Sequence, residues 1–210
     1  MNIALKAAKR GEKAVLVDLD IVNPYFRSAD HDAMLEAHGI KVIVPPYAKS
    51  GVDLPIVPAE VASVFVQDYD CVVFDVGGDS VGATVLGRYY KEFEKKRNIL
   101  QVCYVVNIRR PLASTADDIC TMFEQIGSAS RLEINGFINN SNLGRETTVE
   151  DLIEGVQVLK EVTTRTGVRV TYISGYEHIL AEFNKKMNNI PYEGVLLPIC
   201  TYTRPVWLDL

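Results

Sequence analysis

Apolar and polar positions alternate in two patterns along the chain. Short runs rich in Val, Ile and Leu end abruptly in polar residues, and between them apolar residues recur at a spacing of three or four. The first pattern predicts buried strands and the second predicts helices that bury one face. The predicted strands are 14–17, 41–44, 71–75, 100–106, 133–138 and 168–173.

The predicted helices fill the intervals between these strands. They are 2–10, 30–38, 59–67, 80–96, 112–126 and 148–165. Thr148 and Asp151 have the spacing of a capping box at the start of the last helix, although Asp replaces the usual Glu or Gln. Strand–helix alternation of this kind predicts an α/β fold: a doubly wound, mostly parallel sheet with helices on both faces. No linker divides residues 1–210, so we expect a single domain.

Composition narrows the class of protein. Hydrophobic residues make up 48% of the chain and charged residues 23%, as in ordinary soluble proteins. The net charge of −5 weighs against a broad nucleic-acid surface. The four cysteines show no metal-ligand spacing, and three of them fall within apolar runs, which suits buried free thiols in a reducing compartment. No apolar stretch approaches the roughly 18 residues that span a bilayer, so we expect a cytoplasmic protein.

Candidate chemistry gathers where the predicted strands end. The ligand sites of open α/β sheets lie at the carboxyl ends of the strands. Two carboxylates spaced by one residue, as at the end of the first strand, point to the same side of an extended chain. An acid that ends a buried strand is the residue type that holds magnesium in nucleotide hydrolases. The strand-end residues are Asp18, Asp20, Asp75, Asn107, Arg109, Arg110, Asn139, Asn140, Ser174 and Gly175.

Glycines and asparagines complete the candidate site. Gly77 and Gly78 follow the second acidic strand end, where they let the backbone approach a terminal phosphate. Asn139 and Asn140 carry both donors and acceptors, which suits the edge of a nucleobase. The plainer alternatives are an ordinary polar strand end and an asparagine-rich turn.

Three motifs together resemble the MinD/ParA/CobQ-like P-loop ATPases. They are Val-Asp-Leu-Asp-Ile-Val-Asn-Pro-Tyr-Phe at 17–26, Val-Val-Phe-Asp-Val-Gly-Gly-Asp at 72–79 and Gly-Phe-Ile-Asn-Asn-Ser-Asn-Leu-Gly at 136–144. The resemblance implies ATP and magnesium as ligands, with Asp18 and Asp20 placing the metal and the attacking water. It also implies a metal role for Asp75 and a base-reading role for Asn139 or Asn140.

The chain departs from that family at its beginning. It starts within the helix that follows the phosphate loop in the family, and no G-x-x-x-x-G-K-[ST] sequence occurs in it. The resemblance places the missing first strand between the strands that bear Asp18 and Asp75. We therefore expect a start-truncated ATPase with little activity alone, and the competing hypothesis is a nucleotide-independent scaffold on a decayed ATPase fold. A phosphorelay receiver fits less well, because strand ends at Asn107 and Asn139 lack its lysine and hydroxyl residue.

The resemblance also implies partners. The complete protein is expected to bind ATP as a homodimer and to act with an unidentified partner protein. Residues 201–210 are neither basic nor amphipathic, so no membrane anchor like that of MinD is expected, and no nucleic-acid surface is evident.

Overall fold

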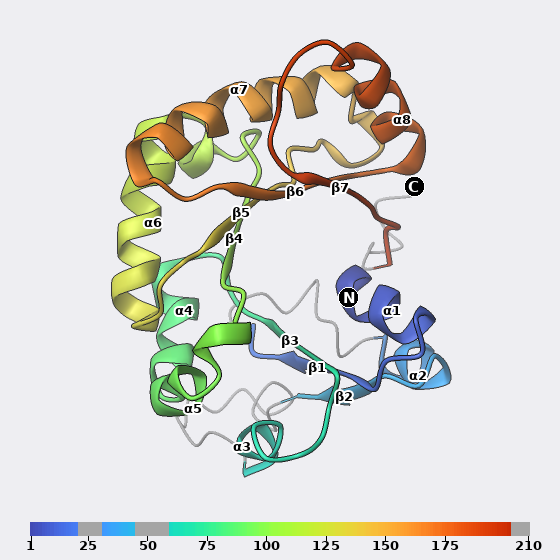
Figure 1. Cartoon of the computed structure of the whole chain (residues 1–210), viewed down its shortest axis with the longest axis vertical. Helices are drawn as coiled ribbons and strands as arrows, with labels where there is room; N and C mark the ends of the chain where they lie inside the picture. Colours follow the sequence, from blue (N-terminus) through green and yellow to red (C-terminus); the bar gives the residue numbers. More distant parts are fainter. Residues whose placement is uncertain (21–30, 45–58, 203–210) are drawn as a thin grey trace. The chain divides into compact units, whose positions relative to one another are not determined.

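The computed structural model describes residues 1–20, 31–44 and 59–202 (Figure 1). The chain forms two compact units. Unit 1 consists of residues 1–77, 81–85 and 201–210, and unit 2 consists of residues 78–80 and 86–200. The expectation of a single domain stays a prediction.

Unit 1 is built on three parallel strands in the order β2-β1-β3. Its elements are α1 (Asn2–Lys9), β1 (Ala14–Asp18), α2 (Asp32–Ala37), β2 (Lys41–Ile43), α3 (Ala59–Ser63), β3 (Cys71–Asp75) and most of α4 (Ser80–Gly87). All five residues of β1 are buried, as expected for the middle strand. Ala4 and Leu5 of α1 pack with Leu16 of β1 and Leu35 of α2 in the core of this unit.

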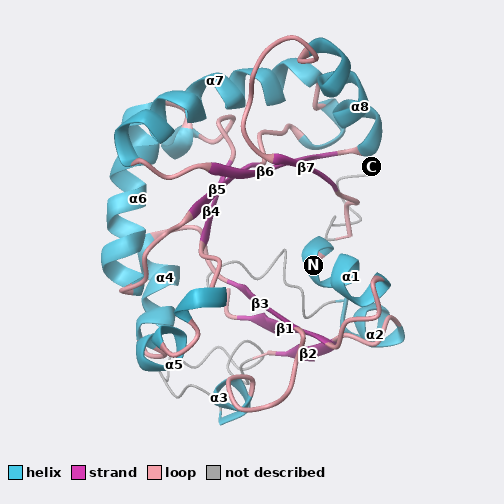
Figure 2. Ribbon diagram, viewed as in Figure 1, coloured by secondary structure: helices cyan, strands magenta, loops and turns pink. Residues whose placement is uncertain are grey.

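Unit 2 is built on four parallel strands in the order β4-β5-β6-β7 (Figure 2). Its strands and α-helices are α5 (Tyr90–Glu94), β4 (Cys103–Val106), α6 (Ala116–Ser130), β5 (Gly136–Asn139), α7 (Val149–Thr166), β6 (Val170–Gly175), α8 (Glu177–Lys186) and β7 (Val195–Pro198). Single 3-10 turns lie at Arg97–Ile99, Pro111–Ala113 and Gly144–Glu146.

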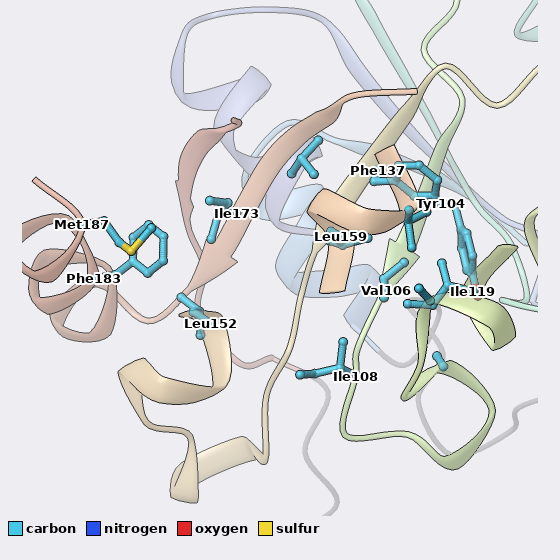
Figure 3. Close-up of a cluster of buried hydrophobic side chains, with 14 of the residues drawn as sticks. Tyr104, Val106, Ile108, Ile119, Phe137, Leu152, Leu159, Ile173, Phe183 and Met187 are labelled. Carbon is cyan, nitrogen blue, oxygen red and sulfur yellow. The ribbon is translucent and has the colours of Figure 1, made fainter. Parts of the chain in front are cut away.

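The core of unit 2 joins the helices to the sheet (Figure 3). Phe137 of β5 and Ile173 of β6 are fully buried, and they pack in one cluster with Leu159 of α7 and Phe183 of α8. Each such side chain contributes roughly 1.5–3 kcal/mol by leaving water. This cluster holds the carboxyl ends of β4, β5 and β6 in fixed register, and those ends carry the polar residues of the candidate site.

The sequence-based predictions of fold class and of most elements are confirmed. The α/β fold with parallel strands is present, and the capping box at Thr148 and Asp151 is formed. The predicted helix 80–96 is wrong as a single element, because α4 ends at Gly87 and α5 begins at Tyr90. The described strands form two sheets rather than one.

One topological expectation is also wrong. The missing strand was expected between the strands that bear Asp18 and Asp75, but β1 and β3 pair directly, with Asp18 opposite Asp75. A parallel pair in continuous register leaves no room for a strand between its members. Among the described residues, β3 is an end strand of the sheet of unit 1, and β4 is an end strand of the sheet of unit 2.

Candidate functional site

Two acids of unit 1 end adjacent parallel strands. Asp18 and Asp75 are register partners, and the amide of Leu19 donates to the carbonyl of Asp75 at 2.7 Å. Asp18 is 4% exposed, and its Oδ1 accepts from the amide of Asp20 at 3.1 Å. A side chain that caps the amide two residues later fixes the first turn of the loop. Asp18 therefore organises the chain that carries Asp20.

The turn after β3 approaches Asp20 and the start of α4. A β-carbon at Gly77 would lie 3.5 Å from Asp20 Oδ1 and 3.2 Å from the Cα of Gly82. A β-carbon at Gly82 would lie 2.7 Å from the Cα of Gly77, closer than side chains tolerate. Only a pair of glycines allows this approach of two backbones. The space around Gly78 is open.

These acids fit a magnesium ion that is shared with a ligand. Within residues 1–20, 31–44 and 59–202, no three His, Cys, Asp or Glu side chains are placed to enclose a metal. Magnesium does not require such an enclosure, because it usually keeps several waters and takes one or two carboxylates together with substrate phosphates. Asp18 and Asp75 supply that donor set at neighbouring strand ends. The predicted metal role of these two acids stays a prediction.

In unit 2, the two predicted asparagines lie in different environments. Asn139 is fully buried. Its Nδ2 donates to the carbonyl of Leu152 at 3.0 Å, and its Oδ1 accepts from the amide of Ser141 at 3.2 Å. A β-carbon at Gly155 of α7 would lie only 2.5 Å from Asn139 Oδ1. The amide of Asn139 therefore joins β5 to α7, and the base-reading hypothesis rests on Asn140.

Asn140 is only partly buried and follows β5 directly. Its backbone amide donates to the carbonyl of Val106 at 2.8 Å, so it continues the pairing with β4. Its Oδ1 accepts from the hydroxyl of Ser174 at 2.8 Å. Both partners hold the residue at the carboxyl edge of the sheet of unit 2.

The side chain of Asn107 fixes the loop after Asn140. Asn107 Oδ1 accepts from the amide of Asn142 at 3.1 Å, and Asn107 Nδ2 donates to the carbonyl of Asn142 at 3.1 Å. Asn142 Nδ2 in turn donates to the carbonyl of Asn140 at 2.7 Å. The Thr147 hydroxyl donates to the carbonyl of Gly144 at 2.6 Å. Backbone groups that a neighbouring strand would normally satisfy are thus satisfied by side chains.

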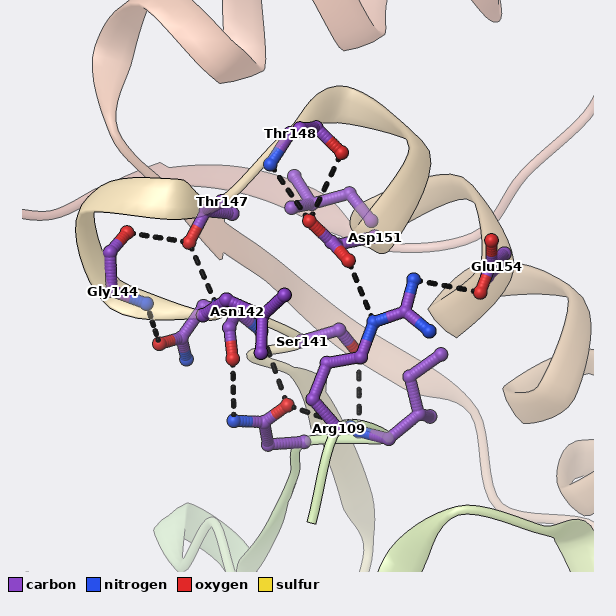
Figure 4. Close-up of polar contacts among 12 residues, drawn as sticks. Arg109, Ser141, Asn142, Gly144, Thr147, Thr148, Asp151 and Glu154 are labelled. Atoms are coloured by element: carbon purple, nitrogen blue, oxygen red, sulfur yellow. Dashed lines mark hydrogen bonds and ion pairs between the residues drawn. The ribbon is translucent and has the colours of Figure 1, made fainter.

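An ion-pair cluster joins the loop after β4 to the first two turns of α7 (Figure 4). Arg109 Nε lies 2.6 Å from Asp151 Oδ1, and Arg109 Nη2 lies 2.7 Å from Glu154 Oε2. Burial raises the pKa of Asp151, but hydrogen bonds from the amide of Thr148, from Arg109 and from the Thr148 hydroxyl lower it by more, so the net pKa lies below its usual value. The hydrogen bond to Asp151 raises the pKa of Arg109. Arg109 is therefore engaged within the fold.

Sequence reasoning placed Asn107 and Ser174 at strand ends but gave them no role. The register of parallel strands could have indicated a role for both residues, because residues that follow adjacent strands become neighbours at one edge of the sheet. Arg110, which the sequence grouped with Arg109, is an exposed residue. Gly175 packs against Leu152 and Leu180 within the core.

Unit 2 also has a cavity of about 340 Å³ that none of the predicted site residues lines. Tyr90, Arg97, Arg131 and Glu133 are among its lining residues. Arg131 has a φ of +59°, an uncommon value for a residue other than glycine, and its guanidinium lies 4.8 Å from the centre of the Tyr90 ring. Side chains of both charges line this cavity, and none of the strand-end residues is among its lining residues.

Comparison with solved structures supports the fold. The signal recognition particle receptor FtsY from Elizabethkingia anophelis aligns with a TM-score of 0.51 and 19% identity over 85% of this chain. FtsY from Mycoplasma mycoides aligns with a TM-score of 0.51 and 14% identity, also over 85% of this chain. The chain spans little more than half of each FtsY chain, at 53% and 56%.

The chain therefore shares the α/β fold of these two FtsY structures. At these identities the similarity concerns the fold alone and does not single out the MinD/ParA/CobQ-like family. No protein-family model matches the chain, and no curated protein is similar to it. Within the described part of the chain, no helix is long and apolar enough to cross a membrane.

Proposed function

We propose that this chain is a nucleotide-binding domain that binds ATP with magnesium. The observation that carries the proposal is the pairing of Asp18 with Asp75 at the ends of two adjacent parallel strands, next to the loop that brings Asp20 to Gly77. The resemblance of the three sequence motifs to P-loop ATPases supports it, and the similarity of the fold to the two FtsY structures is consistent with it.

The residues that end and follow β1 and β3 have distinct roles in this proposal. Asp75 holds the magnesium ion, directly or through water, and Asp18 supports the ion while it fixes the loop. Asp20 orients the water that attacks the terminal phosphate in the complete enzyme. Gly77 and Gly78 place backbone amides at the phosphate, and the open space around Gly78 suits that approach. For unit 2, the resemblance of the sequence motifs assigns the contact with the base to Asn140.

The 210 residues contain no G-x-x-x-x-G-K-[ST] sequence, so the backbone cradle for the phosphates is absent from them. We therefore propose that these residues alone bind nucleotide weakly and hydrolyse it negligibly. The homodimer, the partner protein and the cytoplasmic location stay predictions.

Calorimetric titration with magnesium-ATP tests the proposal. It compares the 210-residue chain with a form extended upstream in its gene by about 20 residues, which is enough for one strand and one phosphate loop. We expect tighter binding by the extended form and at least tenfold weaker binding by Asp75→Asn. Asp68→Asn, which changes an exposed acid of unit 1, serves as the control and leaves the affinity unchanged.

Removal of magnesium sharpens the comparison. If Asp75 acts through the metal, wild type and Asp75→Asn bind ATP equally in EDTA. If no form of the chain binds ATP, the proposal fails, and the alternative of a nucleotide-independent scaffold on this fold takes its place.

A further inference from the structure

The loop that carries Asn140 has little backbone freedom. The amide of Asn140 donates to Val106, and its carbonyl accepts from Asn142 Nδ2. The next residues are held by the Asn107 side chain, and the amide of Ser141 donates to the buried Asn139. The remaining variable at Asn140 is the direction in which its side-chain amide faces.

Ser174 sets that direction. Ser174 is 4% exposed, and its hydroxyl lies 2.8 Å from Asn140 Oδ1 and 3.2 Å from the carbonyl oxygen of Asn139. Both of these atoms are acceptors, so the single hydroxyl hydrogen of Ser174 is shared between them, and the contact with Asn140 Oδ1 is the shorter one. With Oδ1 engaged by a buried hydroxyl, Nδ2 is the polar atom of Asn140 that remains for a ligand.

The consequence is a difference in which base edges fit. An asparagine with both amide atoms available pairs with adenine, donating to N7 and accepting from the 6-amino group. An asparagine that only donates loses the second contact. Guanine presents two acceptors at the same edge, N7 and O6, and both suit a donor.

We propose that Ser174 is a positioning residue that turns Asn140 into a hydrogen-bond donor, so that the bound base is read through its acceptor atoms and not through a 6-amino group. This inference rests on the proposed nucleotide-binding function. It assigns to Ser174 control over base selectivity, without any contact between Ser174 and the nucleotide.

The test is the ratio of the affinities for magnesium-ATP and magnesium-GTP, measured by calorimetry on the form of the chain that binds nucleotide more tightly. The ratio cancels the contribution of the phosphates and of the metal. Ser174→Ala releases Oδ1 to accept from the adenine 6-amino group, so the preference for ATP over GTP rises at least fivefold. Ser130→Ala, which removes another buried hydroxyl of unit 2, leaves the ratio unchanged.

A second variant leaves the buried Ser174 unchanged, so its result does not depend on whether the fold tolerates alanine at that position. Asn140→Asp replaces the Nδ2 donor with an acceptor, so the preference for ATP also rises at least fivefold. If Oδ1 already faces the ligand in the wild type, this variant leaves the ratio within twofold, and the proposal is overturned.

The outcomes separate the two proposals. Nucleotide binding with a ratio that neither variant moves overturns the role of Ser174 and leaves the nucleotide-binding function intact. Absence of binding to both nucleotides overturns both. The nitrogen–proton correlation spectrum of side-chain amides supplies a readout without nucleotide, in which Ser174→Ala shifts the Asn140 signal and Ser130→Ala does not.

Discussion

The contact between Gly155 and Asn139 leads to a sharp prediction about stability. Gly155 lies within α7, where alanine is normally favoured over glycine by about 1 kcal/mol. A β-carbon at this position would lie 2.5 Å from both Asn139 Oδ1 and Ser141 Oγ. Ordinary contacts begin at 3.4 Å, so the buried asparagine would have to move by 0.9 Å (3.4 minus 2.5).

The expected cost follows from that displacement. Overpacking a tight interior costs about 1–3 kcal/mol. Loss of one buried partner of the Asn139 amide leaves an unsatisfied polar group, at a further 1–3 kcal/mol or so. After subtraction of the gain in helix propensity, Gly155→Ala should destabilise unit 2 by about 1–5 kcal/mol.

Gly127→Ala is the matched control, because Gly127 also lies in a helix and its β-carbon would meet only Leu132 O, at 3.8 Å. This variant should be as stable as the wild type or up to about 1 kcal/mol more stable. Urea denaturation at 25 °C, followed by far-ultraviolet circular dichroism, measures both. If Gly155→Ala is as stable as Gly127→Ala, Asn139 is not the tight link between β5 and α7 described above.

Three further predictions concern the candidate site. The folded-state pKa of Asp151 is lowered, so its stabilising effect is present above its unfolded pKa and is lost as pH falls through the folded pKa. In urea denaturation, Asp151→Asn should therefore cost about 1–2 kcal/mol at pH 7 and progressively less below pH ~4. A cost that does not depend on pH would contradict this prediction. Asn107→Ala should speed hydrogen exchange of the Asn142 amide about tenfold, because the variant loses the oxygen that accepts from this amide. Asn107→Asp is the control that retains the acceptor, and equal exchange in the two variants would contradict the role of Asn107 in holding the loop. Gly82→Ala should destabilise unit 1 by about 1–3 kcal/mol and Gly78→Ala should not, because only the first β-carbon would meet backbone, and equal denaturation midpoints would argue against that contact.

The sequence predicts the strands well because the apolar runs are long enough to be buried on both faces. It misses the break after Gly87, since the apolar spacing continues across it while the backbone does not. It also misses the order of the strands in unit 1. The hydrophobic pattern indicates that a strand is buried, but tertiary packing determines which strands pair with it in the sheet. The pairing of Asp18 with Asp75 is therefore found only in the structure.

The candidate site was predictable in composition and not in detail. The strand-end rule finds both asparagines, yet nothing in their local sequence distinguishes them. The distinction comes from Gly155, which follows Asn139 by 16 positions (155 minus 139) and makes room for one amide inside the fold. The direction of the Asn140 amide likewise depends on Ser174, the neighbouring residue on the next strand.

Paramagnetic broadening by manganese tests the central claim most directly. Mn²⁺ replaces Mg²⁺ at sites of oxygen ligands, and it broadens amide signals near the ion. With Mn²⁺ and ATP added to isotope-labelled protein, we expect selective loss of the signals of Leu19, Asp20, Val76 and Gly77, and their recovery in Asp75→Asn. Broadening that is spread over exposed acidic surfaces, and that is unchanged in Asp75→Asn, would contradict a nucleotide-bound metal at the ends of β1 and β3.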